Sequence, residues 1–184
     1  SIQAKRSEVL FVDYIAEHLT PTGRAGIIVP EGVLFQNQTA YKDLRKMLVE
    51  NSLVAVISLP QGVFNPYAGV FILDKSLAKR ATTIGFFKVE NDGYELGAQR
   101  REITKNDLPV VKAELKSYLE SIRTGQSDVS LTFASGLIVP KENINASVNY
   151  TLNSERYRVG EVNERLEWPL VPIGELCIVE RGAS

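Results

Sequence analysis

One loop of the sequence combines flat aromatic side chains with turn-forming residues. Its aromatic members are Phe64 and Tyr67, and its turn formers are Gly62, Pro66 and Gly69. A ring held on such a loop can stack on a nucleobase, which is worth about 1–3 kcal/mol per stacked base. The alternative is that Phe64 only fills the edge of a sheet, and the pattern alone favours this second interpretation.

Adjacent basic residues indicate a second kind of contact. Arg100 and Arg101 follow a predicted turn, and arginine can hold a phosphate through two parallel hydrogen bonds. We therefore predict these two residues as candidate phosphate contacts. The other basic pairs, Arg45 with Lys46 among them, are predicted to lie on solvated faces.

The residues needed for conventional catalytic centres are missing. A single cysteine, Cys177, and a single histidine, His18, cannot form a structural zinc site. His18 is predicted at the surface of a helix, near its C-terminus. No glycine-rich phosphate loop follows any predicted strand. We therefore assign no catalytic, cofactor-binding or metal-binding residue within this span.

Composition excludes several classes of protein. The chain has 184 residues, 44% of them hydrophobic, with 21 Lys and Arg against 22 Asp and Glu. These values are typical of a globular domain, not of a disordered chain or a disulfide scaffold. No apolar run approaches the roughly 20 residues that span a bilayer, and the start lacks the apolar core of a signal peptide. The sequence therefore predicts an intracellular, cytoplasmic protein without a membrane partner.

The periodicity of the first 60 residues predicts an α/β fold. A helix over 7–19 has an apolar stripe that includes Phe11 and Val12. Two apolar runs, 25–29 and 54–59, lack alternation and predict strands covered on both faces, as in a parallel sheet. Between them, a helix through about residue 50 begins at Thr39 as a possible N-cap. Strand, helix and strand in this order predict a right-handed βαβ unit.

The remainder is expected to add edge elements. A strand over 84–89 is followed by a predicted hairpin turn at Asn91-Asp92-Gly93. A long helix ends at Thr124 and carries one apolar seam, which we expect to pack on its own domain, with docking of another subunit as the alternative. Residues 126–167 are expected to be an irregular tail and linker with one strand at 136–140. An apolar pattern starts again at 168–184.

Taken together, these segments resemble the methylation subunit of type I restriction-modification systems. The resemblance runs from residue 1 to about 158. The matching segments are 4–8, 11–15, 23–32, 41–48, 58–64 and 86–89 with 97–101. Proteins of this family are adenine-specific DNA methyltransferases that use S-adenosylmethionine.

The resemblance implies that residues 1–104 are the C-terminal half of a Rossmann-like catalytic domain. The cofactor loop and the Asn-Pro-Pro-Phe tetrapeptide of the family would precede this chain. Asn65-Pro66-Tyr67 lacks the second proline and follows another strand, so we do not assign it that role. The aromatic at the position of Phe64 stacks on the flipped target base in related enzymes, which reverses the preference stated above.

The resemblance also implies partners, and the sequence differs from the family pattern at one point. The partners would be double-stranded DNA and a specificity subunit or a fused target-recognition domain; a restriction subunit is a further candidate. The stretch 168–184 resembles the start of such a recognition domain, after the long helix of 105–125 and the linker. The family has several polar residues where Val70 here runs into Phe71. Either the loop is shortened here or residues are missing from the chain, and the short predicted strand 71–73 favours the second alternative.

Overall fold

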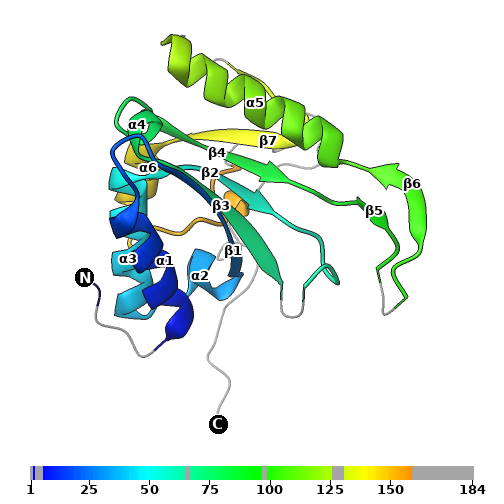
Figure 1. Cartoon of the computed structure of the whole chain (residues 1–184), viewed down its shortest axis with the longest axis horizontal. Coiled ribbons are helices and arrows are strands. Elements are labelled where there is room, and N and C mark those ends of the chain that lie inside the picture. The colour runs from blue at the N-terminus through cyan, green and yellow to red at the C-terminus, as the bar shows by residue number, and fades with distance from the viewer. Residues whose placement is uncertain (1, 3–5, 65–66, 97–98, 126–130, 159–184) are drawn as a thin grey trace, which may run out of the picture.

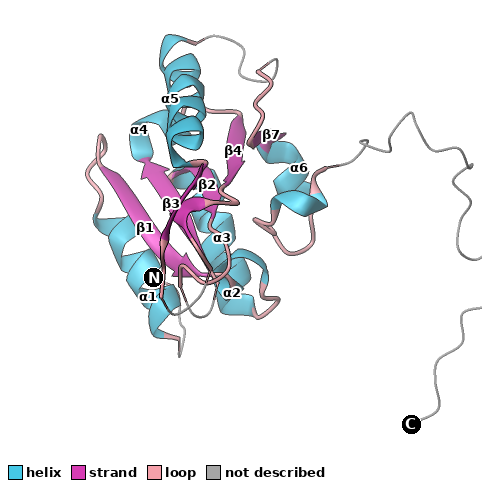
Figure 2. Cartoon of the chain, turned by 90° about the vertical axis from the view of Figure 1, so that its right-hand side faces the viewer, coloured by secondary structure: helices cyan, strands magenta, loops and turns pink. Residues whose placement is uncertain are grey.

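The computed structural model describes residues 2, 6–64, 67–96, 99–125 and 131–158, and shows a sheet with helices on both faces (Figures 1 and 2). The apolar residues form two clusters, one on each side of the sheet. The α/β fold class predicted from the sequence is confirmed. The strands are β1 (Arg24–Pro30), β2 (Leu53–Ser58), β3 (Ala68–Asp74), β4 (Thr83–Lys88) and β7 (Gly136–Pro140), with a separate pair β5 (Asp92–Tyr94) and β6 (Glu102–Asn106). The helices are α1 (Ser7–His18), α2 (Gly32–Phe35), α3 (Thr39–Asn51), α4 (Lys75–Ala78), α5 (Leu108–Thr124) and α6 (Lys141–Ala146), with a 3-10 turn, η2, at Ser154–Arg156.

The order of the main sheet is β1-β3-β2-β4-β7. Strands β1 and β2 run in the same direction, as predicted, but β3 lies between them and is antiparallel to both. Among the described strands, only β2 and β4 form a parallel pair. The expectation of an aborted strand at 71–73 is wrong, because β3 begins at Ala68 and its pairing with β1 continues without a shift through Val70 and Phe71.

Strand β1 lies at the edge of the sheet. The prediction that it is covered on both faces is wrong, because one of its faces is exposed. Its exposed and partly buried residues alternate, and only Val29 is buried. Ile28 is 55% exposed. A Cβ atom added to Gly26 would meet nothing within 4 Å. Gly26 pairs with Ile72, and Ile72 packs against the apolar cluster that includes residues of α5. The exposed positions Gly26 and Ile28 therefore lie on the face of the sheet that α5 covers.

Helix α1 has the predicted length but a different buried face. Val9, Val12, Asp13 and Ala16 are buried, whereas Phe11 is 68% exposed. Leu10 and Tyr14 are exposed as well, and together with Phe11 they line a shallow apolar hollow of about 350 Å³. This apolar surface lies on the helix that runs beside the open edge strand β1 (Figure 1).

The seam of α5 packs on the sheet of its own chain, as the sequence analysis favoured. Val111, Tyr118 and Ile122 are buried against β2 and β4. Leu115 and Leu119 are partly buried in the same cluster, and Leu108, the first residue of the helix, is exposed. The seam is therefore occupied, which removes the support for its alternative role in docking another subunit.

Two predictions for the second half of the chain are wrong. Asp92 and Gly93 do not form a hairpin turn but belong to β5, which pairs with β6 outside the main sheet. The stretch 136–158 is not an irregular tail, since β7 pairs with β4, and Ile144 and Leu152 are fully buried. Its polar residues cover the core instead of linking domains. The stretch 168–184 lies outside the described residues.

A hydrogen bond between α1 and α3 gives a pH-dependent contribution to stability. The hydroxyl of buried Tyr41 donates to Glu8 Oε1 at 2.6 Å. This bond lowers the pKa of Glu8. A carboxylate with a lowered pKa stabilises the fold above its unfolded pKa of about 4.3 and loses that contribution as the pH falls through its folded pKa.

We expect Tyr41→Phe to lower the free energy of unfolding by about 1 kcal/mol at pH 7, the net value of one hydrogen bond. The difference from the parent should shrink as the pH is lowered through the pKa of Glu8. Urea unfolding at pH 7 and at a series of pH values below about 4.3, where the loss begins, measures it. Tyr14→Phe on the exposed face of α1 is the control, and a difference that does not change with pH would contradict the prediction.

Candidate functional site

The loop with the predicted stacking residue lies at one edge of the sheet. The carboxyl ends of β1, β2 and β4 share this edge, where open α/β sheets place their ligands. The amide of Glu31 after β1 donates to the carbonyl of Tyr67 at 2.8 Å, and the amide of Leu59 after β2 donates to Ala68 at 3.3 Å. The two ends of the loop are therefore fixed to neighbouring strands.

Phe64 is 42% exposed on this loop. Its ring is therefore not sealed in the core. Gly62 precedes it with a φ of 88°, a left-handed conformation that favours glycine. A Cβ atom at Gly62 would also stand 3.6 Å from the Leu96 side chain, so the loop lies against the segment after β5. Pro66 lies outside the described residues.

The two other predicted loop residues are placed differently. Tyr67 is half-buried, and its carbonyl fixes the loop to Glu31. Gly69 is not in the loop but in β3, where it pairs with Val29 and Ser58. A Cβ atom at Gly69 would stand 3.2 Å from Leu34 Cδ1, so this glycine allows α2 to approach the sheet closely.

The predicted arginines differ in their surroundings. Arg100 forms an ion pair with Asp92 and lies with its guanidinium carbon 5.5 Å from the centre of the Tyr94 ring. Its Nη1 donates to the carbonyl of Gly62 at 3.4 Å. Arg100 thus connects the β5–β6 pair to the loop before Phe64, which favours a structural role in which it stabilises the position of this loop. Arg101 is exposed, and its described partner is Gln99, at 3.2 Å.

A buried cation stands close to the same edge, and the prediction that Arg45 lies on a solvated face is wrong. Arg45 is fully buried, and within the described residues its guanidinium donates to backbone carbonyls alone. The acceptors are Val33 (2.9 Å), Gln36 (2.7 Å), Asn149 (2.7 Å) and Tyr150 (3.0 Å). Burial lowers the pKa of Arg45 to about 10, so it stays charged at neutral pH.

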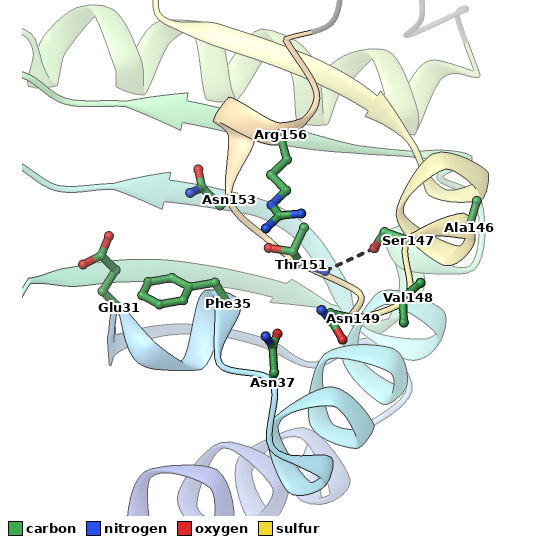
Figure 3. A pocket seen from close by; sticks show the side chains of 10 residues that line it. All are labelled: Glu31, Phe35, Asn37, Ala146, Ser147, Val148, Asn149, Thr151, Asn153 and Arg156. Carbon is green, nitrogen blue, oxygen red and sulfur yellow. Dashed lines mark hydrogen bonds between the residues drawn. The ribbon is translucent and has the colours of Figure 1, made fainter. Parts of the chain in front are cut away.

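Sequence reasoning did not find a cavity of about 760 Å³ beside this cation (Figure 3). Its walls come from α2 with the residues on either side of it and from the segment after α6. The lining residues are Glu31, Phe35, Asn37, Ala146, Ser147, Val148, Asn149, Thr151, Asn153 and Arg156. The only signal in the sequence was the polar stretch after residue 143, which was interpreted as a tail.

Other kinds of site are not found in the described residues. No group of three or more His, Cys, Asp or Glu side chains among them is arranged to hold a metal ion. His18 is exposed at the end of α1, with Nδ1 2.8 Å from the carbonyl of Tyr14, as predicted for a surface histidine. In the same part of the chain, every helix is too short or too polar to cross a membrane.

Comparison with known proteins adds evidence on the family. A model described as N-6 DNA Methylase matches residues 2–165. The methylase subunit of the type I restriction enzyme EcoEI from Escherichia coli is 39% identical over 70 residues, which are 38% of this chain and 14% of that relative. The chain thus matches only a small part of the length of this curated relative.

Solved structures show the same fold. A structure from work on complex assembly and conformational transition of the type I R-M system has a TM-score of 0.65 at 22% identity, over 95% of this chain and 36% of its own. The crystal structure of a type I restriction-modification system methyltransferase subunit from Streptococcus thermophilus has a TM-score of 0.57 at 23% identity, over 82% and 30%. At these identities the likeness concerns the fold alone.

Proposed function

Because the chain belongs to the N-6 DNA methylase family, we propose that it supplies the target-base side of the active site of an adenine-specific DNA methyltransferase in a type I restriction-modification system. The observation that carries this proposal is the exposed ring of Phe64 beyond the carboxyl end of β2. The loop around the ring is held at both ends by strands and in the middle by Arg100.

In this proposal the Phe64 ring stacks on an adenine that has left the duplex. Removing a base from the stack costs a few kcal/mol, and a flat ring in the new position offsets part of that cost. The positive φ of Gly62 and the contact with Arg100 support a loop whose shape exists before the base arrives. Such preorganisation reduces the entropy lost on binding.

The catalytic tetrapeptide and the methyl donor belong, we propose, to another part of the catalytic domain. The open edge of β1 and the bare apolar positions beside it, Gly26 and Ile28, support this, because an unpaired edge strand offers a template for further strands. The exposed apolar side chains of α1 beside that edge suit the same contact. The solved structures are about three times as long as their matched segments, which agrees with this division.

S-adenosylmethionine, which methyltransferases of this family generally use, is the methyl donor we propose. It supplies an electrophilic methyl group for the adenine amino nitrogen. The described residues do not fit this cofactor, because no glycine-rich turn among them connects a strand to a helix. We therefore assign no cofactor contact to this chain and derive no step through it.

Arg101 is the phosphate contact that we propose, since its side chain is exposed beyond the brace made by Arg100. Its partner would be the backbone of double-stranded DNA. The other proposed partners are the specificity part of the system and a restriction subunit, which the type I relatives support.

The test is Phe64→Ala in the complete enzyme. We expect kcat/KM for methylation to fall about ten- to a hundredfold, which corresponds to the loss of one stacked base. A fluorescent adenine analogue at the target position should lose its ordered environment in parallel. Phe64→Tyr, which keeps the ring, is the matched control and should retain most of the activity. Normal turnover of the alanine variant with the analogue still ordered would contradict the proposal.

A further inference from the structure

The cavity near Arg45 has neither Phe64 nor Arg100 or Arg101 in its lining, although it shares Glu31, whose amide holds Tyr67, with the Phe64 loop. We propose that it binds a single nucleotide unit, with the base edge on its carboxamide side chains. The inference rests on the construction and chemistry of the cavity walls, and not on the role of Phe64.

The walls of the cavity are fixed to each other. Arg45 donates to carbonyls on both sides, those of Val33 and Gln36 from the α2 region and those of Asn149 and Tyr150 from the segment after α6. The amide of Leu152 also donates to the carbonyl of Leu34 at 2.8 Å. These bonds keep the space between the two segments at a defined width. A largely preformed cavity of this kind is typical of ligand sites.

Strain occurs in the same segment. Tyr150 has a φ of 47°, in the left-handed region, and is the one residue other than glycine with a positive φ in the described part of the chain. Such a conformation is unfavourable for a residue with a side chain and persists where the surroundings enforce it. Here the bond from Arg45 Nε to the Tyr150 carbonyl does so. Strained residues cluster at ligand sites, which agrees with the proposal.

One buried hydroxyl of the cavity wall, that of Thr151, has no hydrogen-bond partner within the described residues. The Thr151 side chain is 4% exposed, and its Oγ1 makes no hydrogen bond within the described residues. Figure 3 shows the Arg156 side chain extending toward Thr151, and both residues line the cavity together with Phe35. Buried polar groups are almost always paired, so a lone hydroxyl at a cavity wall points to a ligand atom.

The lining residues select the chemistry of the ligand. The side chains of Asn37, Asn149 and Asn153 can each donate and accept, which matches the mixed edge of a nucleobase. Phe35, 43% exposed, offers a face for stacking, and Arg156 offers a donor for a phosphate. With Glu31 as its one carboxylate, the lining is poorly suited to a metal ion. A volume of about 760 Å³ suits a small ligand.

The experiment uses the complete protein and two probes, free 2′-deoxyadenosine 5′-monophosphate and a short single strand of deoxyadenosine nucleotides. Binding is measured by titration calorimetry for the parent and for Thr151→Val, which keeps the shape and removes the hydroxyl. We expect the affinity of at least one probe to fall about three- to tenfold, the value of one hydrogen bond. The melting temperature should stay unchanged or rise, because Oγ1 has no partner in the fold to lose.

Ser52→Ala is the matched control, since Ser52 Oγ is the other buried hydroxyl without a partner among the described residues and does not line the cavity. It should leave both affinities unchanged. Should Thr151→Val fail to fold, Asn153→Asp replaces it. An aspartate keeps the oxygen that accepts from the Glu155 amide at 3.1 Å but removes the amide donor.

The two probes distinguish the source of the nucleotide. If Thr151→Val binds only the free nucleotide more weakly than the parent does, the cavity is assigned to a soluble ligand. If the variant binds the strand more weakly, the cavity is assigned to a nucleotide within DNA. No binding of either probe to the parent, or equal binding to the parent and Thr151→Val, would overturn the inference. Phe64→Ala in the same titrations separates the two proposals, because it should not change binding in the cavity.

Discussion

Replacing Arg45 by methionine is expected to lower the free energy of unfolding by about 3–5 kcal/mol. The substitution keeps an unbranched side chain but removes every donor. The carbonyls of Val33, Gln36, Asn149 and Tyr150 then lose a partner; the bond to Val33 is buried and the other three are partly buried. Unpaired buried groups cost about 1–3 kcal/mol each, offset in part because no charge remains buried.

Urea unfolding of the protein at pH 7 measures this loss. Lys46→Met is the matched control, because Lys46 is the exposed neighbour on the same helix, and it should change stability by less than about 0.5 kcal/mol. Arg45→Lys should be almost as unstable as Arg45→Met, since one ammonium cannot reach carbonyls on both walls. A loss below about 1 kcal/mol for Arg45→Met would show that water replaces the guanidinium, contrary to the prediction.

The second large effect is expected for Gly85→Ala, with a loss of about 2–3 kcal/mol. Gly85 lies in β4, and an added Cβ would come within 2.8 Å of the Phe87 ring and 2.9 Å of the Tyr118 ring. Both rings are buried, and Tyr118 is fixed by its hydroxyl, 3.0 Å from Thr83 Oγ1. Neither ring can move aside without distorting the contact between α5 and the sheet.

Gly26→Ala provides the comparison at a second strand glycine. It lies in β1 with open space around the added atom, so we expect a change within about 0.5 kcal/mol. Thermal unfolding of both variants measures the difference. Combining Gly85→Ala with Phe87→Leu should recover part of the loss, because a smaller side chain relieves one of the two clashes. Equal stability of the two glycine variants would contradict the packing argument.

Local periodicity predicted the elements whose environment is determined by their own residues. The helices α1 and α3 and the strands β2, β4 and β7 lie where apolar spacing placed them. Strand β3 was predicted too short, because Ala68 and Gly69 have no β-branched side chains and follow a loop of turn formers. Its partner β2 is the preceding strand, but its place between β1 and β2 also depends on pairing with β1, which α2, α3 and β2 separate from it in the sequence and which no local window contains.

The burial of Arg45 could not be predicted from its neighbours. A basic residue beside Lys46 on an amphipathic helix is usually solvated, and the carbonyls that receive the guanidinium include Asn149, 104 positions later. The cavity was missed for the same reason, since its two walls come from segments widely separated in the sequence.

The loop prediction gave mixed results. The sequence placed Phe64 beyond the end of a strand at the carboxyl edge, and the ring is exposed there. Its stacking role stays a prediction. The sequence did not indicate that Arg100 would turn back to Asp92 and Gly62, because that contact requires the β5–β6 pair to fold beside the loop.

The position of β3 between β1 and β2 has a consequence for the order in which the protein assembles during translation. Within this chain, β1 and β2 both hydrogen-bond to β3, so neither meets that partner before residues 68–74 leave the ribosome. Until then β1 is a nascent apolar segment with unpaired amides, the kind of stretch that chaperones bind. Pairing across such sequence distances is slow compared with helix formation. We therefore expect α1 and α3 to form early on the emerging chain and the sheet to close late.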